Sequence, residues 1–161
     1  MDLDMRDPVH RVSPRAMVVW AAGALLQGIV AAAALTVAAE VWHWFPMPWW
    51  AWSVYVVVAL AYLAVMPTVR YRIHRWETTD VAVYTQTGWL TRERRVAPMS
   101  RVQTVDLGQG PVSRLLGLAS VTATTASAAG PLEIQGLDRA VAEHLVAELT
   151  RRTADLAGDA T

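Results

Sequence analysis

The sequence predicts an α+β protein in which a two-helix transmembrane hairpin precedes a small antiparallel sheet and a C-terminal helix. Two long apolar runs come first, short β-branched segments punctuated by glycine and proline follow, and the last apolar residues recur at a helical period. Apolar residues make up 54% of the 161 positions, and most precede the predicted domain. We expect an N-terminal cytoplasmic tail at 1–15, the hairpin at 16–66, a folded domain at 67–152 and a disordered tail at 153–161.

The first apolar run, Ala16 to Ala39, contains 24 residues without a charge. As a helix it would extend about 36 Å, which is enough to cross a bilayer. The second run, Trp49 to Met66, has 18 uncharged residues, and we expect Pro67 to end it. A cleaved signal peptide is the alternative for the first run, because Arg15 precedes it and small residues end it. The run is long for a signal-peptide core, however, and a second span follows.

Arginine placement predicts the orientation of this hairpin. Three arginines precede the first span, none lies in the connector Glu40 to Pro48, and three follow the second span. They are Arg6, Arg11, Arg15, Arg70, Arg72 and Arg75. The positive-inside rule then places both termini in the cytoplasm. All 14 basic residues are arginine, which is typical of GC-rich bacterial genes, so we expect a two-span protein of the bacterial cytoplasmic membrane.

Two further patterns belong to the hairpin. Tryptophans gather at the predicted outer turn, where amphipathic rings favour the headgroup level: Trp42, Trp44, Trp49, Trp50 and Trp52. Ala24, Gly28 and Ala32 form a ladder of small residues on one face of the first helix. This ladder indicates close helix packing, either between the two spans or between two copies of the chain.

After Pro67 the pattern changes to that of a sheet. Thr68 to Glu77 is a strand candidate, and Asp80 to Pro98 resembles a hairpin turning at Gln86 to Gly88, with Val81 and Val83 on one face. The segments RVQTVDL, ASVTATTA and PLEIQ supply three more strands. A helix follows Asp138, a suitable N-cap, because Val141, Leu145 and Leu149 recur every four residues.

The stretch DLGQGPVSRLLGLA, Asp106 to Ala119, raises the question of a phosphate-binding loop. It matches neither GxxxxGK followed by serine or threonine nor GxGxxG, and Pro111 removes an amide that a phosphate cradle would use. Proline at the first helical position and Gly117 just past the last instead predict one short helix, PVSRLL. The segment is therefore interpreted as a strand, a short helix and the next strand.

The same segment carries a family resemblance. RVQTVDLGQGPVSRLLGLASV (Arg101 to Val121), together with GWLTRERRVAP (Gly88 to Pro98) and GLDRAVA (Gly136 to Ala142), resembles the bacterial pleckstrin-homology-like membrane proteins often called YdbS-like. That resemblance implies two preceding spans, a strongly bent antiparallel sheet capped by a C-terminal helix, and no known catalytic activity. It implies no particular lipid ligand. The motif residues that we expect to be structural are Gln103, Gln109, Pro111 and Gly117.

Five arginines are the candidate contacts for a lipid or a protein partner: Arg92, Arg94, Arg95, Arg101 and Arg114. The first three could meet anionic lipid at the inner leaflet or form a solvated strand face. Arg101 and Arg114 bracket Asp106, so they could form a local ion pair or contact a partner.

We expect a non-enzymatic interaction or assembly module on the cytoplasmic face, which binds a protein partner or itself. The alternatives are direct binding of anionic lipid through the basic hairpin and an accessory role beside a membrane enzyme or transporter. The chain has no cysteine, its charge is balanced, and its four histidines lack metal-binding spacing: His10, His43, His74 and His144. We therefore predict no catalytic residue, metal, cofactor or nucleic-acid partner.

Overall fold

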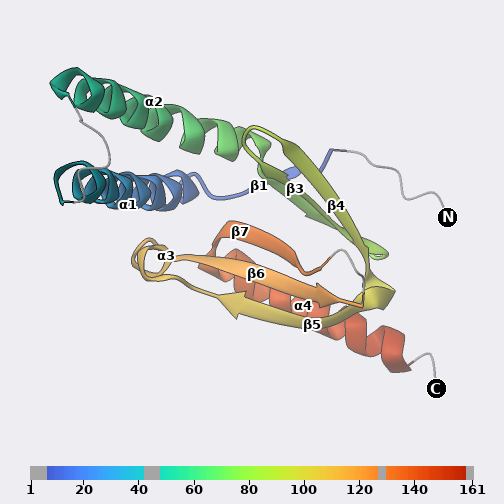
Figure 1. The fold of residues 1–161 in the computed structure, drawn as a ribbon. Helices are drawn as coiled ribbons and strands as arrows, with labels where there is room; N and C mark the ends of the chain where they lie inside the picture. Colours follow the sequence, from blue (N-terminus) through green and yellow to red (C-terminus); the bar gives the residue numbers. More distant parts are fainter. Residues whose placement is uncertain (1–6, 42–47, 127–129, 159–161) are drawn as a thin grey trace.

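The chain folds as a helical hairpin joined to a PH-like domain of two antiparallel sheets and a capping helix, which confirms the predicted fold class (Figure 1). A computed structural model describes residues 7–41, 48–126 and 130–158. The helical elements are α1 (Ala16–Thr36), η1 (Val37–Val41), α2 (Trp49–Ile73), η2 (Met99–Arg101), α3 (Pro111–Leu115) and α4 (Arg139–Gly158). The strands are β1 (His10–Arg11), β2 (Arg75–Thr78), β3 (Ala82–Gly88), β4 (Arg92–Pro98), β5 (Val102–Gly108), β6 (Leu118–Thr125) and β7 (Leu132–Asp138).

The hairpin helices project together from one end of the domain (Figure 1). Both are long and apolar enough to cross a membrane. The small-residue ladder of α1 lies at the contact between them, where the Tyr55 hydroxyl of α2 donates a hydrogen bond to the Gly28 carbonyl at 2.5 Å. The ladder therefore serves packing within the chain. Trp49 and Trp50 are exposed at the start of α2, whereas Trp42 and Trp44 lie outside the described residues.

Helix α2 does not end at Pro67, as the sequence suggested, but continues to Ile73. Proline deprives the carbonyl four residues earlier of its helical donor, yet such prolines are tolerated where neighbouring segments pack around them. Pro67 and Met66 are both buried here. The prediction of a strand from Thr68 was therefore wrong for its first seven residues, and β2 begins only at Arg75.

The strands form a four-stranded sheet in the order β1-β2-β3-β4 and a three-stranded sheet in the order β5-β6-β7. All neighbours are antiparallel, and the last three strands fall in the three segments that the sequence indicated. Strand β1 comes from the predicted N-terminal tail and pairs His10 with Trp76 of β2. This pairing joins the residues before α1 to the residues after α2.

The β3–β4 hairpin turns later than predicted, because β3 extends to Gly88 and β4 begins at Arg92. Gly88 has φ +122°, and a Cβ there would lie 1.8 Å from the Thr91 carbonyl oxygen, so the turn requires glycine. The predicted alternation was also wrong: Val81 is exposed, whereas β3 is buried continuously from Ala82 to Gln86. Strand β3 lies inside its sheet and also contacts α2 and β7, so both of its faces are covered.

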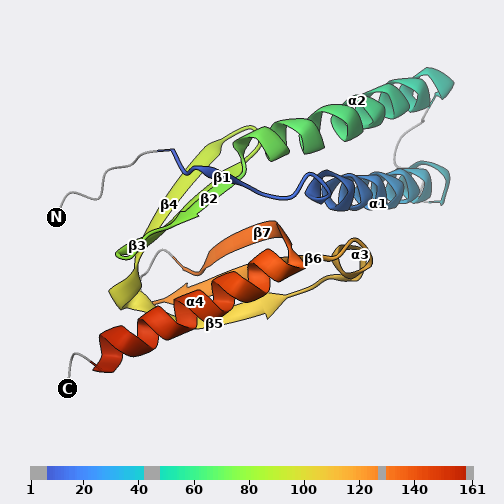
Figure 2. The same ribbon diagram turned by 180° about the vertical axis from the view of Figure 1, so that it is seen from behind.

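Helix α4 runs along the three-stranded sheet (Figure 2). The predicted apolar face is buried at Leu145 and Leu149 but not at Val141, which is 43% exposed while the neighbouring Ala142 is buried. Leu145 and Leu149 are fully buried in the core, together with Leu118 and Leu137. The helix continues to Gly158, so the prediction of disorder from residue 153 was wrong as far as that residue. The Thr153 hydroxyl donates to the Leu149 carbonyl at 2.8 Å, and no proline or glycine interrupts the helix before Gly158.

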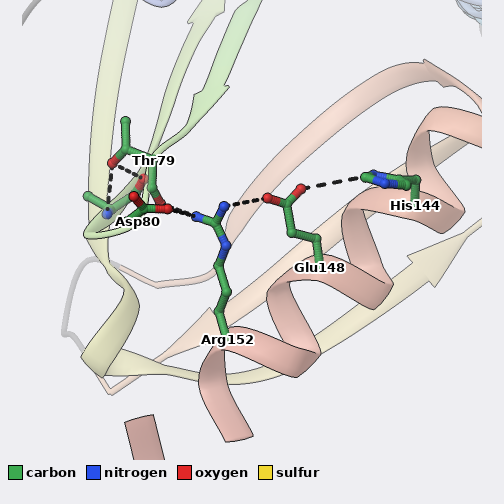
Figure 3. Close-up of polar contacts among 6 residues, drawn as sticks. Thr79, Asp80, His144, Glu148 and Arg152 are labelled. Atoms are coloured by element: carbon green, nitrogen blue, oxygen red, sulfur yellow. Dashed lines mark hydrogen bonds and ion pairs between the residues drawn. The ribbon is translucent and has the colours of Figure 1, made fainter. Parts of the chain in front are cut away.

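An arginine near the end of α4 ties this helix to the turn between β2 and β3 (Figure 3). The Arg152 guanidinium donates to the Thr79 carbonyl at 2.7 Å and lies 3.1 Å from the Asp80 carboxylate. It also pairs with Glu148 one turn earlier, at 2.5 Å. A single side chain thus connects the two sheets through the capping helix.

Replacing Arg152 by alanine should lower the free energy of unfolding by about 1–2 kcal/mol, because a part-buried carbonyl and carboxylate lose their donor. The neighbouring Arg151 is exposed and provides the matched control, for which Arg151→Ala should change stability by less than about 0.5 kcal/mol. Thermal unfolding of the full chain in detergent measures both variants. Equal thermal unfolding midpoints for Arg152→Ala and Arg151→Ala would show that the Arg152 contacts do not stabilise the domain.

Candidate functional site

The first helix is fixed to the domain at its N-terminal end. The Ser13 amide donates to the Gly136 carbonyl at 2.8 Å, and the Ser13 hydroxyl donates to the Asp138 carboxylate at 3.0 Å. Gly136 has φ +75°, and a Cβ at this position would lie 2.5 Å from the Cβ of Ala16. Strand β7 can approach α1 this closely only because residue 136 is glycine.

The end of α2 is fixed at the same place. The Arg70 guanidinium carbon lies 4.7 Å from the centroid of the Trp20 ring, and an Arg70 nitrogen donates to the Gln135 side chain at 2.9 Å. The Gln135 amide nitrogen in turn donates to Glu133 at 2.9 Å. Arginine stacking and a chain of hydrogen bonds therefore connect α1, α2 and β7.

His74 directly follows α2 and is buried against the same tryptophan, with ring centroids 4.8 Å apart. Its Nδ1 lies 3.0 Å from the Arg70 carbonyl oxygen, so Nδ1 carries the hydrogen in the neutral ring. Burial lowers the pKa of His74 from 6.5 to about 4, and the positive charge of Arg70 contributes to this shift. The imidazole is consequently neutral at physiological pH.

A cavity of about 390 Å³ opens between the end of α2, the β3–β4 hairpin and β7. Its lining carries both signs of charge, since Arg70 and Arg95 face Glu93 and Glu133. The lining therefore carries two arginines and two glutamates, and it has no excess of positive charge for an anionic ligand.

The arginines of β4 are engaged within the chain. Arg94 donates to the Gln86 side chain at 3.1 Å and forms an ion pair with Asp7. Arg95 pairs with Glu93 at 2.7 Å and donates to the Pro131 carbonyl at 3.2 Å. Arg92, at the start of the strand, is exposed.

Three of the five predicted arginines line one groove of about 270 Å³ between the two sheets. The groove is bordered by β4, by η2 and by the residues at the start of β7. Its lining comprises Arg94, Arg95, Val96, Ala97, Pro98, Arg101, Thr125, Gly130 and Leu132. Among the strands of the described residues, β4 is the outer strand of its sheet and pairs only with β3. We call this feature the basic groove.

Arg114 is not part of the basic groove, because it lies on α3 beside α1 (Figure 1). Within the described part of the chain, no ion pair joins Asp106 to Arg101 or Arg114, so the predicted local pairing is not found.

The motif residues lie around the predicted short helix. Gln109 donates to the Leu118 carbonyl at 2.8 Å, which holds β5 to the start of β6. Pro111 begins α3, and Gly117 ends it with φ +68°. Gln103 is exposed on β5.

Sequence reasoning missed the residues that join the hairpin to the domain, chiefly Trp20, Gln135 and Gly136. Trp20 lies in a uniformly apolar run, and Gln135 lies in a short strand without any distinctive pattern. Gly136 breaks the apolar strand PLEIQGL, and an isolated glycine inside a strand often marks a close backbone approach. That signal could have identified the junction.

Comparisons with known proteins agree with this architecture. The family model described as "Bacterial PH domain" matches residues 16–153, and so includes both helices of the hairpin. A protein of Bacillus subtilis (strain 168), named UPF0699 transmembrane protein YdbS, is 28% identical over 139 residues, which cover 82% of this chain and 87% of the relative. No solved structure matches the chain.

The stability of the protein should decrease with acidification because of His74. Above pH 6.5 the imidazole is neutral in both the folded and the unfolded chain, so this residue gives no pH dependence. Between pH 6.5 and about 4 only the unfolded chain binds the proton, and the free energy of unfolding should fall by about 3 kcal/mol. Denaturant titration of the full chain in detergent across this range measures the effect.

The variant His74→Asn keeps a donor near the Nδ1 position and removes the titrating ring, so its stability should fall less over the same range. His144→Asn, at an exposed histidine of α4, is the matched control and should retain the fall. If the free energy of unfolding of His74→Asn falls with pH as much as that of the natural chain, His74 is not the source of the pH dependence.

Proposed function

The chain belongs to the bacterial PH domain family, and we propose that it is a membrane-anchored, non-enzymatic interaction module. In this proposal the helical hairpin spans a bacterial cytoplasmic membrane, and the PH-like domain binds a protein partner or a second copy of the chain at the cytoplasmic face. The observation that carries the proposal is the basic groove along the outer edge of β4.

The basic groove fits an extended peptide. The edge of β4 that faces away from β3 offers backbone donors and acceptors to an added strand, as in other domains that bind by strand addition. Arg94, Arg95 and Arg101 place positive charge along the groove, while the half-buried Val96 gives it apolar contact area. An extended segment with acidic side chains has the complementary chemistry.

Binding of anionic lipid through the β4 arginines is the alternative. Arg94 and Arg95 already engage Asp7, Gln86, Glu93 and the Pro131 carbonyl, so a lipid phosphate, like an acidic peptide, would exchange with these partners. A lipid headgroup does not use the outer backbone edge of β4, whereas an extended peptide does. Arg92 is exposed and lies at the end of β4 nearest the hairpin, which is the observation in favour of this alternative.

The proposed orientation is supported by the strand pairing of β1 with β2. His10 and Arg11 precede α1, whereas their partners Trp76 and Arg75 follow α2. Strands on opposite sides of a bilayer cannot pair, so this pairing supports a hairpin whose two ends lie on the same side. The arginines that flank the helices support the cytoplasm as that side.

We predict that a photo-reactive amino acid at Val96, inside the basic groove, will cross-link a discrete protein or a second copy of the chain in native membranes. The same group at Thr150, on the exposed face of α4, is the matched control and should give no such product. Arg101→Glu should reduce the cross-linking yield at Val96 several-fold, because it reverses a charge of the groove. A cross-link to lipid alone would favour the lipid alternative. An unchanged cross-linking yield with Arg101→Glu would contradict the basic groove as the binding site.

The orientation can be tested because the natural chain has no cysteine. With Glu40→Cys, a membrane-impermeant maleimide should label intact spheroplasts, since this residue follows the first span. With Thr150→Cys, labelling should require permeabilisation. The reverse pattern would show that the domain lies outside.

A further inference from the structure

Two turns of the domain present large apolar side chains to the surroundings. Outside the helical hairpin, the most exposed large apolar residues that the structure describes are Leu115, at 87%, and Leu90, at 80%. Leu115 lies on α3, and Leu90 lies in the turn between β3 and β4. We call these two turns the α3 tip and the β3–β4 tip.

The β3–β4 tip reaches back along α2. The Trp89 ring packs edge-to-face on the Tyr62 ring, with centroids 5.3 Å apart and an interplanar angle of 82°. Tyr62 lies eleven residues before Ile73, the last residue of α2, which is about 16 Å along the helix axis. The tip therefore lies beside the apolar part of the helix, and Figures 1 and 2 show this turn next to α2.

The α3 tip lies on the other helix of the hairpin. Helix α3 contacts α1, and the figures place it next to the turns of α1 nearest the domain. Leu116 packs against the core, whereas the preceding Leu115 is directed outward and Val112 is also exposed. Each tip thus brings an exposed leucine to the flank of a helix that is apolar on its outer face.

We propose that the two tips enter the cytoplasmic leaflet of the membrane that the hairpin spans, so that bilayer lipid is their partner. The inference rests on the proposed function, because it requires α1 and α2 to cross the bilayer with the domain on the cytoplasmic side. Lipid surrounds the exposed faces of both helices at that level, so it also meets the tips that pack on them. Leu90 and Leu115 then contact acyl chains, and Trp89 occupies the interfacial region.

The residues next to the two leucines fit this position. Arg92 follows Leu90 by two residues, and Arg114 immediately precedes Leu115; both arginines are exposed. Long basic side chains beside an inserted apolar residue extend to the phosphate level, where anionic lipid attracts them. This arrangement assigns a role to two predicted contact residues that lie outside the basic groove.

The shapes of the tips are fixed before lipid binds. Gly88 permits the β3–β4 turn, and Gly117 takes φ +68° at the end of α3. Insertion then requires little further ordering of the backbone, because both turns are already held by the sheets. Attachment at two tips and two helices prevents the domain from swinging about the hairpin.

The test uses the full chain with single cysteines at Leu90→Cys and Leu115→Cys, each labelled with an environment-sensitive fluorophore. The protein is reconstituted in vesicles of phosphatidylcholine and phosphatidylglycerol. Lipids that carry a nitroxide on the acyl chain and aqueous iodide serve as quenchers. Leu26→Cys, on the outer face of α1, is the membrane control, and Thr150→Cys, on the far helix, is the aqueous control.

Labels at both tips should be quenched by nitroxide lipid, and their iodide quenching should be several-fold weaker than that at Thr150→Cys. If the tip labels match Thr150→Cys while Leu26→Cys is quenched by lipid, the insertion proposal is wrong and the spanning hairpin stands. If Leu26→Cys also escapes lipid quenching, both the spanning hairpin and the insertion of the tips are wrong.

Discussion

The close contact between Ala16 and Gly136 is the constraint on which the rest of the architecture depends. It sets where α1 starts relative to β7, and it thereby places Trp20 beneath both Arg70 and His74. Arg70 lies in the last turn of α2, and His74 directly follows that helix. The Trp20 ring of α1 therefore also holds the end of α2. The placement of the hairpin on the domain depends on this close approach of the Gly136 backbone to Ala16.

The arginines of the chain divide between structural and exposed roles according to their partners. Arg70 and Arg152 each connect elements that are distant in sequence, through a ring or through a carbonyl group. Arg94 and Arg95 also bind groups elsewhere in the chain, the Gln86 side chain and the Pro131 carbonyl, and both carry charge in the basic groove. Because a planar guanidinium can stack and donate several hydrogen bonds at once, a chain without lysine can use one residue type for all of these tasks.

Local patterns predicted much of this fold, and tertiary contacts account for the differences. Hydropathy located both apolar helices, and the punctuation by Pro111 and Gly117 located α3. The extension of α2 beyond Pro67 was not predictable, because it depends on packing around that residue. Three arginines of the groove were selected from the sequence, but their convergence depends on how the two sheets meet, which no local pattern encodes. The junction residues were missed for the same reason.

The pairing of β1 with β2 also has a consequence for the order in which the protein is made. Strand β1 leaves the ribosome before the helical hairpin, whereas its partner β2 is synthesised only after the whole hairpin. Gly136, which receives α1, emerges later still. The four-stranded sheet therefore cannot close until both helices have been synthesised. Strand β1 therefore lacks its partner strand until the hairpin is complete, and closure of this sheet follows the synthesis of both helices.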